Sequence, residues 1–165
     1  MESFGGPLSQ SWHEFTLDLQ HRILNRMRNL GMTPVLPAFA GHVPKSLVPK
    51  YPNVTFSKQN WNGFLPTYLL DANERLFQEI GSTFLGEYIS EFGTNHVYNC
   101  DTYNEMDPIS SDPDYITKTG EAIYKVSKMW NNYFFAFNQL RWTNQLQKPS
   151  KTKVPRVVFN DSLSL

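Results

Sequence analysis

Helical and strand-like segments alternate along most of the sequence, and this order constrains the fold more than any other feature. Residues 12–30 have helical periodicity and precede an apolar, proline-containing run at 32–40. A second helical segment begins at residue 71 and precedes the apolar run HVYNC at 96–100, and a third begins at residue 112. Helices that alternate with short apolar runs predict an α/β fold with a parallel sheet.

The first helical segment has recognisable signals at both ends. Ser11 and Glu14 have the spacing of a capping box, and Gly31 follows the last apolar residue. We therefore expect a helix over 12–30. Its apolar stripe consists of Phe15, Leu19, Ile23, Met27 and Leu30.

The other two helical segments carry similar signals. The second opens with DANE at 71–74 and ends before Gly93, while the third begins at Asp112-Pro113, where proline suits the first helical turn. The apolar stripe of the second consists of Leu76, Phe77, Ile80, Phe84, Tyr88 and Phe92. The residues of the third that we expect to face inward are Ile116, Thr119, Ile123 and Val126.

Two segments lack a clear pattern. Residues 44–70 show no sustained periodicity, so we expect a long functional connection that covers part of the protein. The aromatic and amide-rich stretch after Met129 leads into a basic, proline-containing tail. We therefore expect one unit over 1–129 and a divergent tail over 130–165.

The composition excludes several function classes. Fifteen basic and fifteen acidic residues cancel, so the sequence predicts neither nucleic-acid nor anionic-membrane binding. No apolar run is long enough for a membrane span. Because Cys100 is the only cysteine, no disulfide framework or metal-thiolate cluster is expected, and we predict no metal and no cofactor. Aromatic residues make up 15%, which suits either a large core or a sugar-stacking cleft.

Signals for cellular location conflict. The start MESFGGPLSQ has no cationic region followed by an apolar one, so it does not predict a signal peptide. Two tripeptides, Asn53-Val-Thr55 and Asn160-Asp-Ser162, nevertheless fit the N-glycosylation pattern of secreted proteins.

The segment DTYNEM at 101–106 carries the candidate chemistry. Glu105 follows the second apolar run, and parallel α/β folds gather reactive groups at the carboxyl ends of strands. Burial between Tyr103 and Met106 would favour the neutral carboxyl that a general acid requires. Asn104 would either bind a sugar hydroxyl or orient this carboxyl. The structural alternative is that Glu105 caps or solvates the following turn.

Three segments resemble the lysosomal α-N-acetylglucosaminidases, a family of glycoside hydrolases. They are GGPLSQSWHEFTLDLQHRILNRMRNLGM, TPVLPAFAGHVP and EFGTNHVYNCDTYNEM, and the resemblance extends over roughly residues 5 to 128. The resemblance implies a (β/α)8 barrel that removes terminal N-acetylglucosamine from heparan sulfate by a retaining mechanism with two glutamates. The glutamate of the Asn-Glu-Met segment, the general acid/base in the family, falls here on Glu105.

The resemblance also implies contacts with a glycan substrate. Trp61 in QNWNGF matches a tryptophan that lines the sugar pocket of the family, although it could equally anchor its own loop. His42 in AGHVP either faces the pocket or fixes the loop through a backbone hydrogen bond. Asp101 and Asn104 are expected to support the pocket.

The length of the chain limits what it can do alone. A complete barrel needs about 250 residues, so we expect an incomplete barrel fragment. In the family the nucleophilic glutamate comes from a strand well downstream of Glu105, so the resemblance implies that this chain lacks the nucleophile and is inactive in isolation. One alternative is a non-catalytic product that binds sugar weakly through Trp61 and Asn104 or associates through open sheet edges. Another is a complete small α/β domain of unrelated function. The family implies a lysosomal location, and the sequence does not determine the oligomeric state.

Overall fold

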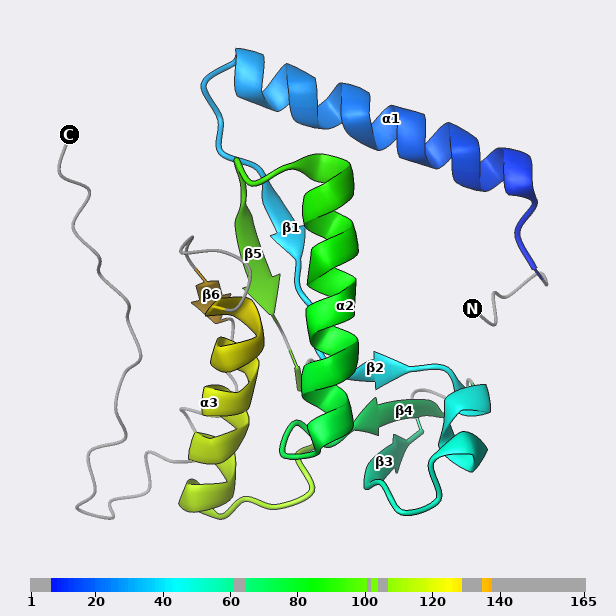
Figure 1. The fold of residues 1–165 in the computed structure, drawn as a ribbon, viewed down its shortest axis with the longest axis vertical. Helices are drawn as coiled ribbons and strands as arrows, with labels where there is room; N and C mark the ends of the chain where they lie inside the picture. The colour runs from blue at the N-terminus through cyan, green and yellow to red at the C-terminus, as the bar shows by residue number, and fades with distance from the viewer. Residues whose placement is uncertain (1–6, 61–64, 101, 104–106, 129–134, 138–165) are drawn as a thin grey trace, which may run out of the picture.

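The computed structural model describes residues 7–60, 65–100, 102–103, 107–128 and 135–137. Within these ranges the predicted alternation of helices and strands is confirmed (Figure 1). Strands β1 (Val35–Pro37), β5 (Val97–Cys100) and β6 (Phe135–Phe137) form one sheet in the order β1-β5-β6.

All neighbours in this sheet are parallel. Leu36 of β1 lies opposite Tyr98 of β5, which in turn lies opposite Phe135 of β6. Helix α2 (Arg75–Phe92) connects β1 to β5, and α3 (Pro113–Lys128) connects β5 to β6. Parallel strands need such long crossovers. The sheet does not close on itself within the described residues, as expected of an incomplete (β/α)8 barrel.

Strand β6 was not predicted. The sequence pattern weakens after Met129, yet Phe135–Phe137 continue the parallel sheet beside β5. This strand lies inside the tail over 130–165 that we expected to diverge. Three apolar residues are too few to show a period, so periodicity alone does not reveal such a strand.

The expectation that 44–70 is one long connection is wrong, because this range contains strands and a short helix. A second sheet, with antiparallel order β2-β4-β3, comprises β2 (His42–Val43), β3 (Phe56–Gln59) and β4 (Thr67–Leu70). A 3₁₀ helix, η1 (Lys45–Lys50), lies between β2 and β3. These strands have two to four residues and mixed burial, so they present no alternation long enough to be recognised. The small sheet lies at the end toward which β1 and β5 point (Figure 1).

Helix α1 (Gln10–Asn29) was predicted within two residues at its start, but its cap was assigned to the wrong serine. Ser9, not Ser11, accepts a hydrogen bond from the Trp12 amide at 3.2 Å. Ser9 therefore has the geometry of an N-cap, and Glu14 instead accepts from the Gln10 side chain. The helix ends as expected, at Gly31 with a positive φ of 72°.

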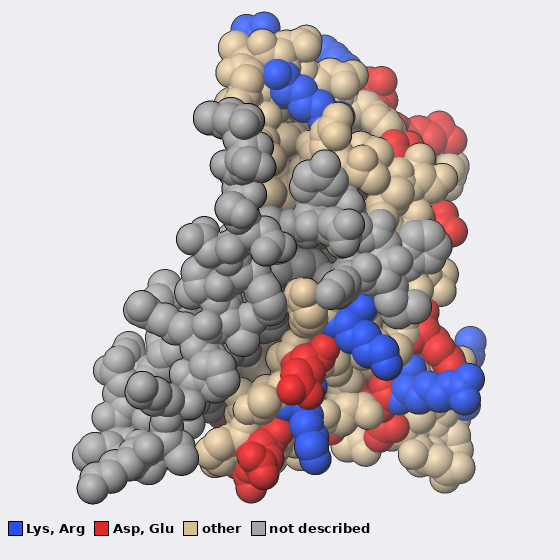
Figure 2. Space-filling model, turned by 60° about the vertical axis from the view of Figure 1, so that its left-hand side comes forward, with Lys and Arg blue, Asp and Glu red and all other residues tan. Residues whose placement is uncertain are grey.

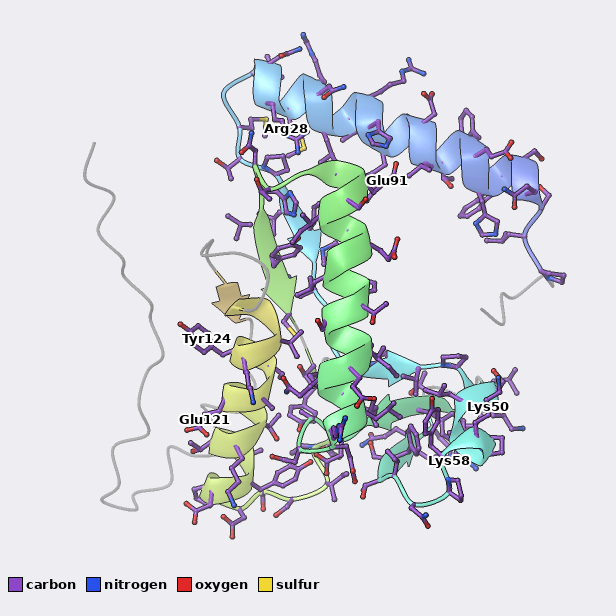
Figure 3. All side chains as sticks on the ribbon, viewed as in Figure 1. Arg28, Lys50, Lys58, Glu91, Glu121 and Tyr124 are labelled. Carbon is purple, nitrogen blue, oxygen red and sulfur yellow. The ribbon has the colours of Figure 1, made fainter. Side chains whose placement is uncertain are left out.

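The apolar stripe of α1 is mostly exposed. Leu24 is the residue of this helix that is fully buried, whereas Phe15 is 62% exposed and Leu30 58%. Two side chains connect α1 to the end of α2: His21 Nε2 lies 2.6 Å from Glu91 Oε1, and Arg28 donates to the Phe92 carbonyl at 3.0 Å. Figure 3 shows Arg28 and Glu91 where the two helices meet, and the amino-terminal half of α1 extends beyond them.

The main core lies between the parallel sheet and helices α2 and α3. Phe77 and Leu85 of α2 are fully buried, as are Tyr98 and Cys100 of β5. The inward residues predicted for α3 are confirmed at Thr119, Ile123 and Val126, which are buried, and Ile116 is half-buried. The predicted stripe of α2 is likewise buried or packed against this core.

The start of α2 differs from the prediction. The DANE segment forms a turn before the helix, because Asp71 Oδ1 accepts from the Asn73 amide at 2.9 Å. The helix then begins at Arg75 and ends before Gly93, whose φ is 75°.

The described surface carries charges of both signs. On the face drawn in Figure 2, Lys and Arg side chains intermingle with Asp and Glu, so neither sign of charge dominates there. No helix in the described part of the chain is both long and apolar enough to cross a lipid bilayer.

Candidate functional site

The carboxyl ends of β1 and β5 lie side by side. Pro37 pairs with Asn99 in the sheet, and the Ala38 amide donates to the Asn99 carbonyl at 2.8 Å. The Cys100 thiol lies 3.6 Å from the Phe39 carbonyl. The chain therefore leaves both strands at one place, where a parallel α/β protein carries its site.

Most of the predicted site residues lie outside the described residues. These are Glu105, Asn104, Asp101 and Trp61. Their predicted roles stay predictions. The nearest described residues to Glu105 in the sequence are Thr102 and Tyr103 before it and Asp107 after it.

His42 is the predicted site residue that the structure describes. It is exposed on β2 and pairs with Leu69 of β4. Leu69 in turn packs against the buried side chain of Tyr103. The strand that carries His42 thus belongs to a sheet that contacts the segment after β5. Whether His42 faces a sugar or fixes its loop stays a prediction.

Gly41 explains why the chain can turn from β1 into β2. Its φ is 94°, and an added Cβ would lie 3.0 Å from the Leu70 carbonyl oxygen and 3.1 Å from the Phe77 ring. The Leu70 amide donates to the Gly41 carbonyl at 2.9 Å. Only glycine suits both this backbone conformation and this close approach.

A polar cluster holds the chain on the amino-terminal side of Glu105. Hydrogen bonds join the Tyr103 side chain to Thr119 and Tyr115, and Tyr115 also bonds to Asp71. Burial raises the pKa of both tyrosines, and the neighbouring tyrosine and Asp71 raise that of Tyr115 further. Both hydroxyls therefore stay protonated at physiological pH.

Asn73 completes this cluster. Its side-chain amide donates to Asp71 Oδ1 at 3.0 Å and to Thr119 Oγ1 at 3.4 Å. The cluster thereby connects the turn before α2, the segment after β5 and helix α3. From the sequence, Asp71 and Thr119 were expected only in helix formation and core packing, because nothing in their spacing signals a shared network.

On the carboxyl-terminal side of Glu105, Asp107 is bound to the small sheet. The Gln59 side chain donates from Nε2 to the Asp107 carbonyl at 2.7 Å. Its Oε1 accepts from the Asp107 amide at 3.2 Å. A glutamine at the end of a four-residue strand gives no sequence signal for such a contact.

The described part of the molecule contains no candidate metal-binding site. Among the residues that the structure describes, no group of three or more His, Cys, Asp or Glu side chains could hold a metal ion. A shallow surface depression beside α3 is lined by Asn73, Ser110, Asp112, Asp114, Tyr115 and Lys118. It does not include His42.

A parallel β/α sheet, with polar residues gathered beyond the carboxyl ends of its strands, defines an open portion of a (β/α) barrel. Residues 1–155 match the family described as the alpha-N-acetylglucosaminidase (NAGLU) tim-barrel domain. The chain is also 48% identical over 130 residues to human alpha-N-acetylglucosaminidase, a match that covers 76% of this chain and 18% of the human protein. The chain belongs to the alpha-N-acetylglucosaminidase family.

Solved structures support the same fold. A family 89 glycoside hydrolase from Clostridium perfringens, in complex with 2-acetamido-1,2-dideoxynojirmycin, matches with a TM-score of 0.69 at 20% identity, over 86% of this chain and 17% of that one. The same hydrolase in complex with PUGNAc matches with a TM-score of 0.69 at 20% identity, over 88% and 18%. This chain spans less than a fifth of the length of these relatives.

Proposed function

We propose that this chain carries the acid/base half of a retaining α-N-acetylglucosaminidase site, with Glu105 as the general acid/base. The observation that carries the proposal is the parallel pairing of β1 with β5, since Glu105 follows the carboxyl end of β5 in the sequence. In barrel enzymes this end of the strands bears the catalytic groups.

The proposed chemistry has two steps. Glu105 gives its proton to the glycosidic oxygen while a partner carboxylate about 5 Å away attacks the anomeric carbon, so the sugar becomes covalently bound as the leaving group departs. Glu105, now ionised, then takes a proton from the water that releases the sugar. We propose that the partner glutamate is supplied by a segment outside these 165 residues, as the small share of the human relative covered here also suggests.

The proposed substrate is a glycan with terminal N-acetylglucosamine, of the heparan sulfate type. The bacterial relative binds 2-acetamido-1,2-dideoxynojirmycin, whose acetamido group supports this choice. Asn104 and Asp101 would bind or orient polar groups of the sugar, Trp61 would stack on its ring, and His42 would border the pocket.

Two further predictions accompany this function. The family membership supports a lysosomal location. We also retain the division of the chain into a barrel part over 1–129 and a divergent tail over 130–165, although β6 adds a parallel strand inside the latter.

The test measures hydrolysis of a chromogenic α-N-acetylglucosaminide by the 165-residue chain and by a longer protein that supplies the partner carboxylate. We expect turnover by the longer protein only, and a decrease of about 10² to 10⁴ in its kcat for Glu105→Gln, because general acid catalysis contributes about that factor. If the 165-residue chain hydrolyses the substrate at a measurable rate and Glu105→Gln abolishes that rate, the proposal that the nucleophile lies outside these 165 residues is refuted.

The alternative is a non-catalytic product that associates with other chains or binds sugar weakly. The exposed apolar stripe of α1 favours association, as does β1, whose second edge is open among the described residues and whose Val35 is 58% exposed. Calorimetric titration with N-acetylglucosamine, repeated with Trp61→Ala, separates sugar binding from association. Heat that disappears in the variant indicates a sugar site.

A further inference from the structure

The side chain of Gln59 and the backbone of Asp107 form a reciprocal pair of hydrogen bonds. Gln59 Nε2 donates to the Asp107 carbonyl at 2.7 Å, and the Asp107 amide donates to Gln59 Oε1 at 3.2 Å. A single bond would leave the peptide free to rotate about it. Two parallel bonds fix the orientation of the peptide as well as its position.

The two sides of the Glu105 segment are held differently. On the amino-terminal side, Thr102 is 1% exposed and Tyr103 5%, so packing and the polar cluster fix the chain. On the carboxyl-terminal side Asp107 is exposed, and within the described part of the chain both of its hydrogen bonds go to Gln59. Gln59 therefore provides the specific restraint on this side.

Gln59 is itself held by the small sheet. It pairs with Thr67 across β3 and β4, and the Asp71 amide that follows β4 donates to the Thr55 carbonyl at 3.1 Å. The Leu70 amide bonds to Gly41, which follows β1. The sheet thus connects Gln59 to the end of β1, which lies beside β5, the strand that precedes Glu105 in the sequence (Figure 1).

Chain connectivity carries this restraint to Glu105. Glu105 and Asp107 are two positions apart in the sequence. We propose that Gln59 is a positioning residue for Glu105, because its amide fixes the backbone just beyond the acid/base and thereby limits where that carboxyl group can lie. The inference rests on the proposed role of Glu105.

The structural half of the proposal is tested by amide hydrogen exchange on the 165-residue chain. Gln59→Leu removes both bonds, so exchange at the Asp107 amide should rise by at least about fivefold relative to other loop amides. Lys58→Leu is the matched control, since the exposed Lys58 neighbours Gln59 on the same strand (Figure 3). It should leave Asp107 unchanged. Equal exchange at Asp107 in Gln59→Leu and the unmodified chain would overturn the proposal.

Gln59→Glu provides a rescue that depends on pH. The ionised carboxylate accepts from the Asp107 amide but cannot donate to its carbonyl, whereas the protonated carboxyl does both. In this variant the Asp107 amide should therefore be less protected from hydrogen exchange at pH 7. Its protection should recover as the pH falls toward the usual pKa of glutamate, about 4.3. The absence of recovery, in a variant that stays folded, would contradict the reciprocal pairing.

The positioning half is tested by ¹³C NMR titration of the Glu105 carboxyl, with its signal assigned from Glu105→Gln. The titration midpoint or the shift of the signal should change in Gln59→Leu and stay unchanged in Lys58→Leu. A change at Asp107 without any change at Glu105 would reduce Gln59 to a structural contact and overturn the proposal. A failure of the proposed acid/base role of Glu105 gives a different result. In that case the longer protein carrying Glu105→Gln would hydrolyse its substrate as fast as the unmodified longer protein.

Discussion

The backbone of Gly81 in α2 lies directly against the side chain of Val126 in α3. A Cβ added at Gly81 would lie 2.8 Å from Val126 Cγ1 and 3.2 Å from the Phe39 ring. Val126 is β-branched and 2% exposed, so it has little freedom to move away. This close approach allows both helices to cover the same part of the parallel sheet.

Gly81→Ala should therefore destabilise the protein by about 1–3 kcal/mol through overpacking, even though alanine favours a helix. Gly120→Ala in α3 is the matched control, because an added Cβ there meets nothing within 4 Å. It should stabilise by about 0.5–1 kcal/mol. Urea denaturation measures both. Equal stabilisation by the two substitutions would contradict the packing described here.

His96 makes stability depend on pH. Its side chain is 2% exposed, and neither ring nitrogen has a hydrogen-bond partner among the described residues. Burial, with a smaller contribution from the charge of Arg28, lowers the pKa of this histidine below its usual 6.5. The unfolded chain thus binds a proton more readily than the folded one, and stability decreases as the pH falls below about 6.5.

His96→Phe keeps an aromatic ring beside Tyr98 and removes the titrating group, so it should lessen this loss of stability. The free energy of unfolding of both proteins at pH 7.5 and pH 5 tests the prediction. An equal loss in both would show that His96 does not titrate as described.

Asn53 should be glycosylated if the chain enters the secretory pathway, as a lysosomal protein does. It is exposed in a turn before β3, and Asn53-Val-Thr55 fits the acceptor pattern. Expression with a secretory leader should give a mass shift that glycosidase treatment removes. Asn53→Gln should remove the same shift, with Asn160→Gln tested separately. A chain without sugar at Asn53 would contradict the predicted accessibility.

The apolar stripe of α1 should make the isolated chain associate, because soluble monomers rarely expose so much contiguous apolar surface. The double substitution Phe15→Glu and Leu19→Lys should shift sedimentation toward the monomer, while its i, i+4 charge pair supports the helix. Asn25→Glu with Asn29→Lys places the same pair at two exposed polar positions of α1 as a control. Identical sedimentation of both variants would exclude the stripe as the interface.

Helices were the most predictable part of the fold. Long periodic segments and glycines such as Gly31 and Gly93 located α1 and α2, and both glycines have the positive φ that ends a helix. The segment SQS contains two serines, and only the structure distinguishes the cap Ser9 from Ser11. Periodicity also could not reveal that the stripe of α1 lacks a covering partner in the described part of the chain, since amphipathicity specifies a face but not its neighbour.

Contacts between distant segments could not be predicted. Gln59 and Asp107 are separated by 48 positions, and the short strands β3 and β6 lack a detectable period. The resemblance in sequence identified the family correctly. It gave no indication of the polar cluster around Tyr103, because a network depends on how three elements pack and not on local spacing.

The most direct test of the central claim is the leaving-group dependence of hydrolysis by Glu105→Ala in the longer protein. A general acid matters most for poor leaving groups, so the variant should lose about 10² to 10⁴ in rate on an alkyl α-N-acetylglucosaminide. Its kcat/KM on a dinitrophenyl α-N-acetylglucosaminide, which departs without protonation, should be largely retained, although kcat should fall because the second step has lost its base. An equal decrease in kcat/KM on both substrates, in a variant that stays folded, would contradict the acid/base role of Glu105.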